Sequence, residues 1–357
     1  MNILLIRLRL IGDVVFTTPI PRALKRAFPD ATISYLVEES AAPVIAHNPH
    51  IDHLIVVRHS RGWGRIADDV KLAARLRRAH YDIVLDLHGG PRSSWLTLVT
   101  GARERIGYKV QGRSWMYSRT VNRPRELRAR HSVMNQWDLL GAIEGWPGGD
   151  ADPAADAVEM APDPAAEQSI STRLAQAGVD ETHELIVAHV SAGNPFRRWP
   201  EGAFIKLLIG LAEVSPRRRI IISSGPSDRQ AATRIAAAAR AALSDAAGRV
   251  VDFGEFTLPE LRALIARSRL FIGGDTGPLH IAATTATPIV GLYGPTLPAR
   301  SAPWRNPAIP TQSLEVSGLP CRPCDQRVCA PGDFRCLTML RAEDVIGAAE
   351  RALRWTA

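Results

Sequence analysis

Short apolar runs alternate with amphipathic stretches along the first half of the chain. Continuous apolar runs of this length are typical of strands buried on both faces of a parallel sheet, and a 3.6-residue period is typical of surface helices. The runs predict strands over Ile3–Leu8, Ala31–Val37, Ile51–Val57 and Tyr81–Leu87. Between them, the pattern predicts helices over Thr18–Phe28 and Arg65–His80.

The same alternation restarts after residue 184. Predicted strands are Leu185–Val190, Arg219–Ser224, Val250–Phe253, Leu270–Gly273 and Ile289–Tyr293. Predicted helices are Pro200–Val214, Asp228–Ala242, Leu258–Ser268, Gly277–Ala286 and Ala342–Trp355. Strands that alternate with helices predict an α/β fold with two doubly wound parallel sheets, whose ligands lie at the carboxyl ends of the strands.

A change of composition separates the two halves. Residues 146–167 are rich in Pro, Gly, Ala and Asp, which is typical of a linker. A chain of 357 residues also exceeds the usual size of one domain. We therefore expect domains over residues 1–165 and 166–340, followed by a C-terminal helix in residues 341–357.

The charge of the chain is uneven. The net charge is +8, and the 22 Lys and Arg against 14 Asp and Glu in residues 1–150 account for all of it. The excess fits either a solvated basic face or a docking surface for an anionic partner, such as a phosphorylated lipid or a membrane surface. The apolar stretches are too short or too charged to span a membrane, and the first residues lack a signal-peptide pattern, so we expect a cytoplasmic protein. No nucleic-acid-binding module is recognisable, and a nucleic-acid partner is not expected.

The stretch FIGGDTGPLH, residues 271–280, combines a strand end, a glycine turn and a helix start. One interpretation is an anion site, because free backbone N–H groups and the helix dipole attract phosphate. The other is an ordinary helix start capped by Asp275. The stretch lacks the markers of Walker loops and of dinucleotide-binding turns, and His280 fits either a structural role or a ligand contact.

Candidate functional residues also follow two other predicted strands. In LIGDVVFTT, residues 10–18, Gly12 and Asp13 are expected in a loop, where Asp13 either caps the next helix or accepts a proton from a bound hydroxyl. In SAGNPFRRWP, residues 191–200, a small-residue turn precedes Arg197 and Arg198. Paired guanidinium groups suit phosphate oxygens, although a solvated basic loop is the plain alternative.

All four cysteines lie within sixteen residues, as Cys321, Cys324, Cys329 and Cys336. Reduced thiols with a packing role, a metal site and one or two disulfides all remain open, because the spacing matches no established metal motif.

Taken together, these motifs resemble glycosyltransferase family 9, the bacterial lipopolysaccharide heptosyltransferases. The resemblance extends over nearly the whole chain and is most specific in IGGDTGPLHIAA, residues 272–283; ILLIRLRLIGDVVF, YDIVLDLHG, SAGNPFRRWP and GLYGPTLPAR also resemble the family. Arg197 stands where the family usually has lysine, and Leu297 stands where an aspartate is common.

The resemblance implies a GT-B architecture, with two Rossmann-like domains, an interdomain cleft, and a C-terminal helix that packs back toward the first domain. The N-terminal domain would bind the acceptor and the C-terminal domain the sugar nucleotide. It further implies metal-independent, inverting transfer of heptose from ADP-heptose to the Kdo/heptose inner core of lipopolysaccharide, on a Kdo-lipid A acceptor. Such an enzyme needs no cofactor and works in peripheral contact with the inner face of the cytoplasmic membrane.

The resemblance also assigns residues. Asp13 is implied as the catalytic general base. The implied donor contacts are Ser191, Arg197, Arg198, Gly274, Asp275, Thr276, Gly277 and His280. The expected acceptor contacts are Gly12, Arg61, Arg65, Arg113 and Arg119. Alternatives are a family member with another nucleotide sugar or acceptor, a sugar-nucleotide 2-epimerase, and a non-catalytic nucleotide-sugar-binding protein.

Overall fold

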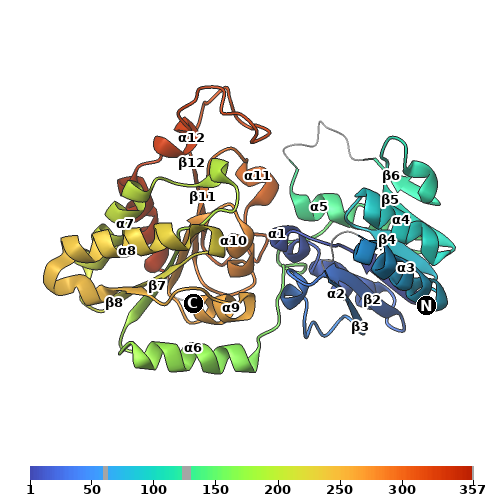
Figure 1. The fold of residues 1–357 in the computed structure, drawn as a ribbon, viewed down its shortest axis with the longest axis horizontal. Coiled ribbons are helices and arrows are strands. Elements are labelled where there is room, and N and C mark those ends of the chain that lie inside the picture. The colour runs from blue at the N-terminus through green and yellow to red at the C-terminus, as the bar shows by residue number, and fades with distance from the viewer. Residues whose placement is uncertain (59–62, 123–129, 356–357) are drawn as a thin grey trace. The chain divides into compact units, whose positions relative to one another are not determined.

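The computed structural model describes residues 1–58, 63–122 and 130–355, apart from the side chains of residues 63–66. It divides the chain into two compact units, Met1–Ala161 and Pro162–Ala357, called unit 1 and unit 2 below. Each unit is built on one parallel six-stranded sheet with helices packed against it (Figure 1).

The sheet of unit 1 has the strand order β3-β2-β1-β4-β5-β6, with all pairs parallel. Its strands are β1 (Asn2–Ile6), β2 (Thr32–Glu38), β3 (His53–Val57), β4 (Ile83–Asp86), β5 (Glu104–Tyr108) and β6 (Arg119–Val121). The central strands β1, β2 and β4 are buried almost throughout, because helices cover them on both faces. This burial explains their continuous apolar sequences.

The helices of unit 1 are α1 (Ile11–Val15), α2 (Pro19–Ala27), α3 (Trp63–Arg78), α4 (Pro91–Thr100) and α5 (Ser132–Trp137). Helices α3 and α4 pack against each other. Leu76 of α3 and Leu96 of α4 join Leu4 and Ile6 of β1 in one core cluster. Shorter 3-10 helices are η1 (Ala42–Val44), η2 (Ser114–Met116) and η4 (Leu140–Ala142).

The sheet of unit 2 repeats this topology, with the order β12-β11-β10-β7-β8-β9. Its strands are β7 (Glu184–His189), β8 (Arg218–Ser223), β9 (Val250–Asp252), β10 (Leu270–Gly274), β11 (Ile289–Tyr293) and β12 (Thr311–Glu315). Numbered within each unit, both sheets have the order 3-2-1-4-5-6. This is the doubly wound order of Rossmann folds.

The helices of unit 2 are α6 (Pro164–Gln176), α7 (Glu201–Val214), α8 (Arg229–Leu243), α9 (Leu258–Ala266), α10 (Gly277–Ala282), α11 (Pro298–Ser301), α12 (Arg335–Thr338) and α13 (Ala342–Leu353). The 3-10 helices are η5 (Pro195–Arg197), η6 (Pro226–Asp228) and η7 (Ser244–Arg249). Helices α7, α8 and α13 supply one core cluster, and α9 packs against α6 and α10.

The last helix packs within unit 2. Helix α13 contacts α7 and strands β10, β11 and β12, and it buries Val345, Ala348 and Ala349. The C-terminal segment therefore shares the core of unit 2. Because a compact unit is not by itself an independently folding domain, the boundaries expected at residues 165 and 340 stay predictions.

The predicted strands and helices of the Rossmann cores are present, with ends that differ by at most four residues. The apolar pattern did not predict several elements: α1, α4, α5, α6, α11, α12, β5, β6 and β12. Part of the predicted linker is also anchored to unit 1. Arg22 Nη1 donates to Glu159 Oε2 at 2.5 Å, and Arg26 Nη2 donates to Asp156 Oδ1 at 2.9 Å.

Among the described residues, none of the helices combines the length and the apolar character that a membrane crossing requires.

Candidate active site

Each sheet has one point at which the chain reverses the direction in which it adds strands. In unit 1 this switch point lies between β1 and β4, and in unit 2 it lies between β10 and β7. Doubly wound sheets bind ligands at the carboxyl edge beside the switch point. The segments that follow these four strands contain Asp13, the turn 87–90, Ser191–Pro200 and Asp275–Gly277, so the topology places the predicted motifs at the two switch points.

Asp13 lies inside helix α1, next to Gly12, and not in the open loop expected from the sequence. It does not cap a helix: the N-cap of α1 is Leu10 at φ 71°, and that of α2 is Thr18. The Asp13 carboxylate forms an ion pair with Arg7 Nη2, and its side chain is 32% exposed. Asp13 is thus a positioned carboxylate that still reaches solvent.

Arg7 follows β1 and is almost fully buried. Its Nη1 donates to the Leu87 carbonyl oxygen at 2.6 Å, while its Nη2 faces Asp13. One guanidinium therefore ties the helix after β1 to the end of β4 across the switch point. Planar arginine suits this bridge, because it presents several donors in fixed directions.

Asp86 organises the turn after β4. Its Oδ1 accepts from the backbone N–H groups of His88 and Gly89 at 3.0 and 2.8 Å, and its Oδ2 accepts from Tyr117 Oη at 2.6 Å. Burial raises the pKa of Asp86, although these hydrogen bonds oppose the shift. The side chain is fully buried, so its role is to hold the turn rather than to meet substrate.

His88 belongs to the same group. Desolvation, reinforced by the charges of Arg7 and Arg9, lowers its pKa to about 4. The imidazole is therefore neutral at pH 7. Arg113, a predicted acceptor contact, donates from Nη2 to the Gly89 carbonyl oxygen at 3.2 Å and so joins this edge.

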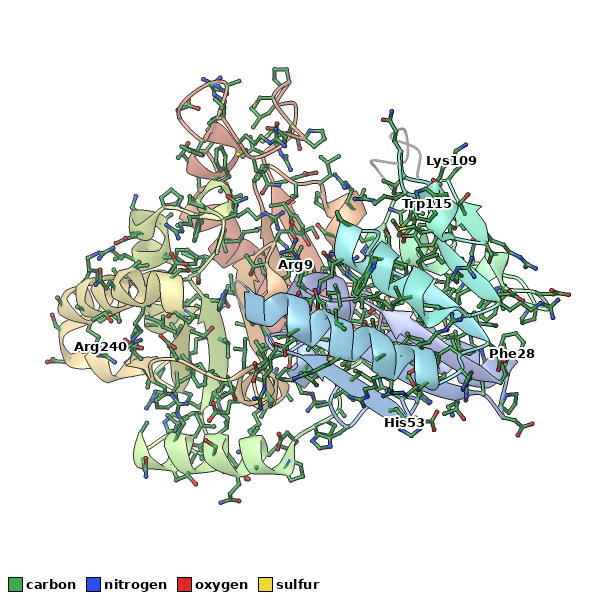
Figure 2. All side chains as sticks on the ribbon, turned by 45° about the vertical axis from the view of Figure 1, so that its right-hand side comes forward. Arg9, Phe28, His53, Lys109, Trp115 and Arg240 are labelled. Atoms are coloured by element: carbon green, nitrogen blue, oxygen red, sulfur yellow. The ribbon has the colours of Figure 1, made fainter. Side chains whose placement is uncertain are left out.

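The other predicted acceptor arginines do not join the group. Arg119 starts β6 and forms ion pairs with Glu144 and Glu104, at 3.2 and 3.7 Å, near the start of β5. Arg61 and the side chain of Arg65 lie outside the described residues. Two exposed residues that the sequence did not single out are Lys109, which directly follows β5, and Trp115 in η2 (Figure 2).

In unit 2, Gly274–Gly277 connect β10 to α10 as expected. The N-cap of α10 is Thr276 and has no side-chain cap bond, so of the two interpretations the one in which Asp275 caps this helix is wrong. The Asp275 carboxylate is instead buried: Thr296 Oγ1 donates to Oδ2 at 2.6 Å, and His280 Nε2 lies 3.4 Å from Oδ1. Burial alone would raise the pKa of Asp275, but His280 and Arg197 outweigh it and hold the pKa below its usual value.

Arg197 reaches the glycine turn from the loop after β7. Its Nη1 donates to the Asp275 carbonyl oxygen at 2.8 Å and lies 3.5 Å from Asp275 Oδ2. Its Nε donates to Gln326 Oε1 at 2.8 Å, and the side chain remains 30% exposed. The structure therefore brings Arg197 and the Gly274–Gly277 turn together.

Ser191 and Arg198 share one buried partner. Ser191 Oγ donates to Asp228 Oδ2 at 2.5 Å, and Arg198 Nη2 lies 2.9 Å from Asp228 Oδ1. Asp228 ends η6, at the start of α8. The arrangement joins two predicted donor residues to the loop after β8.

The four cysteines are free thiols in the structure, so the disulfide alternative is absent from it. They line one small cavity of about 100 Å³ together with apolar residues that include Phe196, Val328 and Phe334. Within the described chain, no three Cys, His, Asp or Glu residues are arranged to hold a metal ion.

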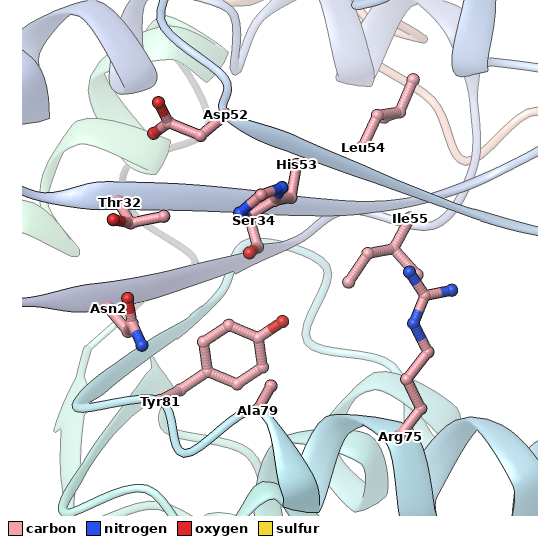
Figure 3. A pocket seen from close by; sticks show the side chains of 10 residues that line it. All are labelled: Asn2, Thr32, Ser34, Asp52, His53, Leu54, Ile55, Arg75, Ala79 and Tyr81. Carbon is pink, nitrogen blue, oxygen red and sulfur yellow. The ribbon is translucent and has the colours of Figure 1, made fainter.

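A larger cavity, of about 430 Å³, lies in unit 1 but not at the carboxyl edge. Its lining includes Asn2, Thr32 and His53, which begin β1, β2 and β3 (Figure 3). Asp52 at its rim is already engaged, because it accepts from the Ile33 N–H and pairs with Lys25 at 2.8 Å. The cavity therefore stands apart from the predicted site residues.

Three supporting residues were missed by the sequence analysis: Arg7, Asp228 and Gln326. Arg7 lies six residues before Asp13, and that proximity was the one available signal. Asp228 lies 37 residues from Ser191 and 30 from Arg198, and Gln326 lies 129 residues from Arg197. Only the tertiary structure brings these partners together.

Comparisons with known proteins identify the family. The family model "Glycosyltransferase family 9 (heptosyltransferase)" matches residues 70–332. "Lipopolysaccharide heptosyltransferase 3" of Escherichia coli is 28% identical over 97% of this chain and 97% of its own length.

Two solved structures show the fold. The glycosyl transferase family 9 protein of Veillonella parvula superposes with a TM-score of 0.81 at 23% identity, over 99% of this chain and 97% of its own. Escherichia coli heptosyltransferase WaaC, solved with ADP-2-deoxy-2-fluoro heptose, superposes with a TM-score of 0.71 at 21% identity, over 98% of this chain and 99% of its own. The two α/β units thus match the GT-B fold of these enzymes. Because the family model covers well over half of the chain, the chain belongs to glycosyltransferase family 9, the heptosyltransferase family.

Proposed function

We propose that this glycosyltransferase moves heptose from ADP-heptose to the Kdo/heptose inner core of lipopolysaccharide. The observation that carries the proposal is Asp13, a partly exposed carboxylate beside the switch point of unit 1, held by the buried Arg7. Its family relatives are named lipopolysaccharide heptosyltransferases, and the structure of one of them was solved with a fluorinated analogue of ADP-heptose.

The reaction that these residues suit is a direct displacement with inversion. An acceptor hydroxyl forms a bond to the anomeric carbon of the heptose as the bond from that carbon to the ADP oxygen breaks. Asp13 accepts the hydroxyl proton, and ADP leaves with the bonding electron pair. A carboxylate that is held by a guanidinium and still reaches solvent is suited to this role of general base.

The donor diphosphate is assigned to unit 2. Negative charge grows on the leaving ADP, and preorganised donors lower the barrier by stabilising that charge. Arg197 supplies a guanidinium 30% exposed beside the Gly274–Gly277 turn, and the turn supplies backbone N–H groups at the start of α10. The buried carboxylate of Asp275 keeps its charge engaged with Thr296, His280 and Arg197 rather than exposed to phosphate.

We assign acceptor binding to unit 1 and propose that this unit contacts a membrane surface. Kdo and lipid A carry anionic groups, and the positive excess of the chain lies in residues 1–150. Lys109, which directly follows β5, is exposed, and Trp115 in η2 is 67% exposed (Figure 2). Tryptophan and lysine together favour a lipid interface, so we propose peripheral contact with the cytoplasmic face of the inner membrane.

ADP release tests this function. The purified chain is given ADP-heptose with no acceptor, with Kdo2-lipid A, or with the same acceptor that already bears one heptose. Release that depends on one of the acceptors supports the proposal and identifies which heptose is added. Absence of release with both acceptors, while ADP still binds, would contradict the proposed sugar and acceptor.

A further inference from the structure

The segment 320–336, here called the cysteine loop, has no role in the transfer proposed above. It is nevertheless fixed to the residues around Asp275. Arg322 Nη2 donates to the Thr296 carbonyl oxygen at 2.7 Å, and the Cys324 N–H donates to the Pro295 carbonyl oxygen at 3.3 Å. Thr296 in turn donates its hydroxyl to Asp275. The cysteine loop thus rests on one side of the glycine turn.

Its second attachment is to the loop that carries Arg197. Gln326 Oε1 accepts two hydrogen bonds, from Asn194 Nδ2 at 2.9 Å and from Arg197 Nε at 2.8 Å. The rings of Phe196 and Phe334 pack edge to face with centroids 5.3 Å apart. Both contacts join residues more than 120 positions apart in the sequence.

These contacts hold two of the three guanidinium nitrogens of Arg197. Gln326 holds Nε, and the Asp275 carbonyl oxygen holds Nη1. A free arginine side chain loses considerable rotamer entropy when it binds an anion, and a side chain that is already held in place loses less. A supporting residue can therefore change affinity without touching the ligand.

The backbone of Gln326 is itself in an unusual conformation, at φ 60°. Non-glycine residues adopt this left-handed region seldom and at a cost in energy, so the surrounding structure has to maintain it. The four cysteines of the same loop line the apolar cavity with Phe196 and Phe334.

We propose that Gln326 is a positioning residue for Arg197, and that through it the cysteine loop sets the affinity for the donor diphosphate. The inference rests on the proposed role of Arg197 in binding that diphosphate. It gives the cysteine loop a function that requires neither a metal ion nor a disulfide.

The test measures binding of ADP by calorimetry, so it does not depend on turnover or on the acceptor. Gln326→Ala removes both hydrogen bonds, and Gln326→Met removes them while keeping the length of the side chain. Arg327→Ala is the matched control. The Arg327 side chain is 85% exposed, and its ion pair with Asp325, at 3.8 Å, is long and contributes little to stability. Melting temperatures show that each variant is folded.

We expect both Gln326 variants to bind ADP about tenfold more weakly, the scale of one hydrogen bond to a charged group. The Arg327→Ala control should bind as the wild type does. In steady-state assays, the KM for the donor should rise while the KM for the acceptor stays unchanged. A merely structural change would not produce this separation.

The double variant distinguishes the inference from the function on which it rests. If Gln326 acts through Arg197, then Arg197→Ala combined with Gln326→Ala should bind ADP no more weakly than Arg197→Ala alone. Weak binding by Arg197→Ala together with wild-type binding by the folded Gln326 variants would overturn the inference alone. Wild-type binding by Arg197→Ala would instead overturn the proposed role of Arg197, and the inference with it.

Discussion

The buried Arg7 holds the Asp13 carboxylate with one guanidinium nitrogen and the Leu87 carbonyl oxygen with another. The first contact fixes the proposed base, and the second fixes the end of β4 on the other side of the switch point. The orientation of Asp13 therefore depends on a residue that does not itself need to touch substrate.

Replacement of Arg7 tests this dependence. We expect Arg7→Ala to lower kcat by about tenfold or more, because a misplaced base transfers protons poorly. Arg7→Lys should recover only part of the loss, since an ammonium cannot bridge two acceptors with the same geometry. The measurement is kcat together with the melting temperature. Unchanged kcat in folded Arg7→Ala would show that Asp13 needs no such support.

Asp228 connects Ser191 and Arg198, and its removal should affect stability and donor binding together. Asp228→Ala leaves Ser191 Oγ without its acceptor in a buried position, which costs about 1–3 kcal/mol. We expect a lower melting temperature and weaker ADP binding in calorimetry. Glu201→Ala is a suitable control, because its pair with Arg234 is exposed and contributes little. Wild-type affinity for ADP in Asp228→Ala would show that the contacts of Asp228 with Ser191 and Arg198 do not support donor binding.

The pH dependence of stability should reflect His189. Burial lowers its pKa to about 4, although the nearby Asp228 charge opposes the shift. The unfolded chain, with a histidine pKa of about 6.5, therefore binds more protons between pH 4 and pH 6.5, and stability rises with pH across this window. The effect is on the order of 3 kcal/mol, because the folded and unfolded pKa values differ by about 2.5 and each pKa unit corresponds to about 1.4 kcal/mol.

Urea unfolding at several pH values checks this expectation. His189→Asn should show a flatter rise in the free energy of unfolding from pH 4 to pH 6.5. The variant His53→Asn serves as the control, because His53 is exposed. A slope in His189→Asn equal to that of the wild type would show that His189 does not control the acid sensitivity.

The cysteines should all react as free thiols. We expect four maleimide adducts by mass spectrometry after denaturation without reductant, in agreement with the free thiols of the structure. In the native protein, Cys336 should react last, because it is buried and burial raises the pKa of its thiol. Fewer than four adducts in the denatured chain would reveal a disulfide or another thiol modification.

The apolar pattern was sufficient to predict the two parallel sheets, because buried strands such as β1 and β10 are continuous apolar runs. It failed for β6 and β12, whose residues are mostly partly or fully exposed and include Arg119 and Glu315. Edge strands of this kind keep polar side chains, and the hydrogen bonds to one neighbour are enough to form them. Helix α6 was missed because its alanine-rich start continued the composition of the predicted linker.

The candidate site was predictable where chemistry lies next to a strand end, as for Asp13, Arg197 and Gly274. The sequence could not show that Asp275 does not cap α10, because an acid before a helix usually caps it, whereas here the carboxylate accepts a hydrogen bond from Thr296. Partners that come from distant segments, such as Gln326, leave no local pattern in the sequence. They follow only from how the strands are ordered.

Transfer to the acceptor by the wild type and by Asp13→Asn tests the central claim most directly. The measurement is mass spectrometry of Kdo2-lipid A, with or without a first heptose, after incubation with ADP-heptose. We expect the wild type to add the mass of one heptose, and we expect turnover by Asp13→Asn to fall by about a hundredfold or more while its affinity for ADP is nearly unchanged. Equal turnover by the two proteins would contradict the assignment of Asp13 as the general base.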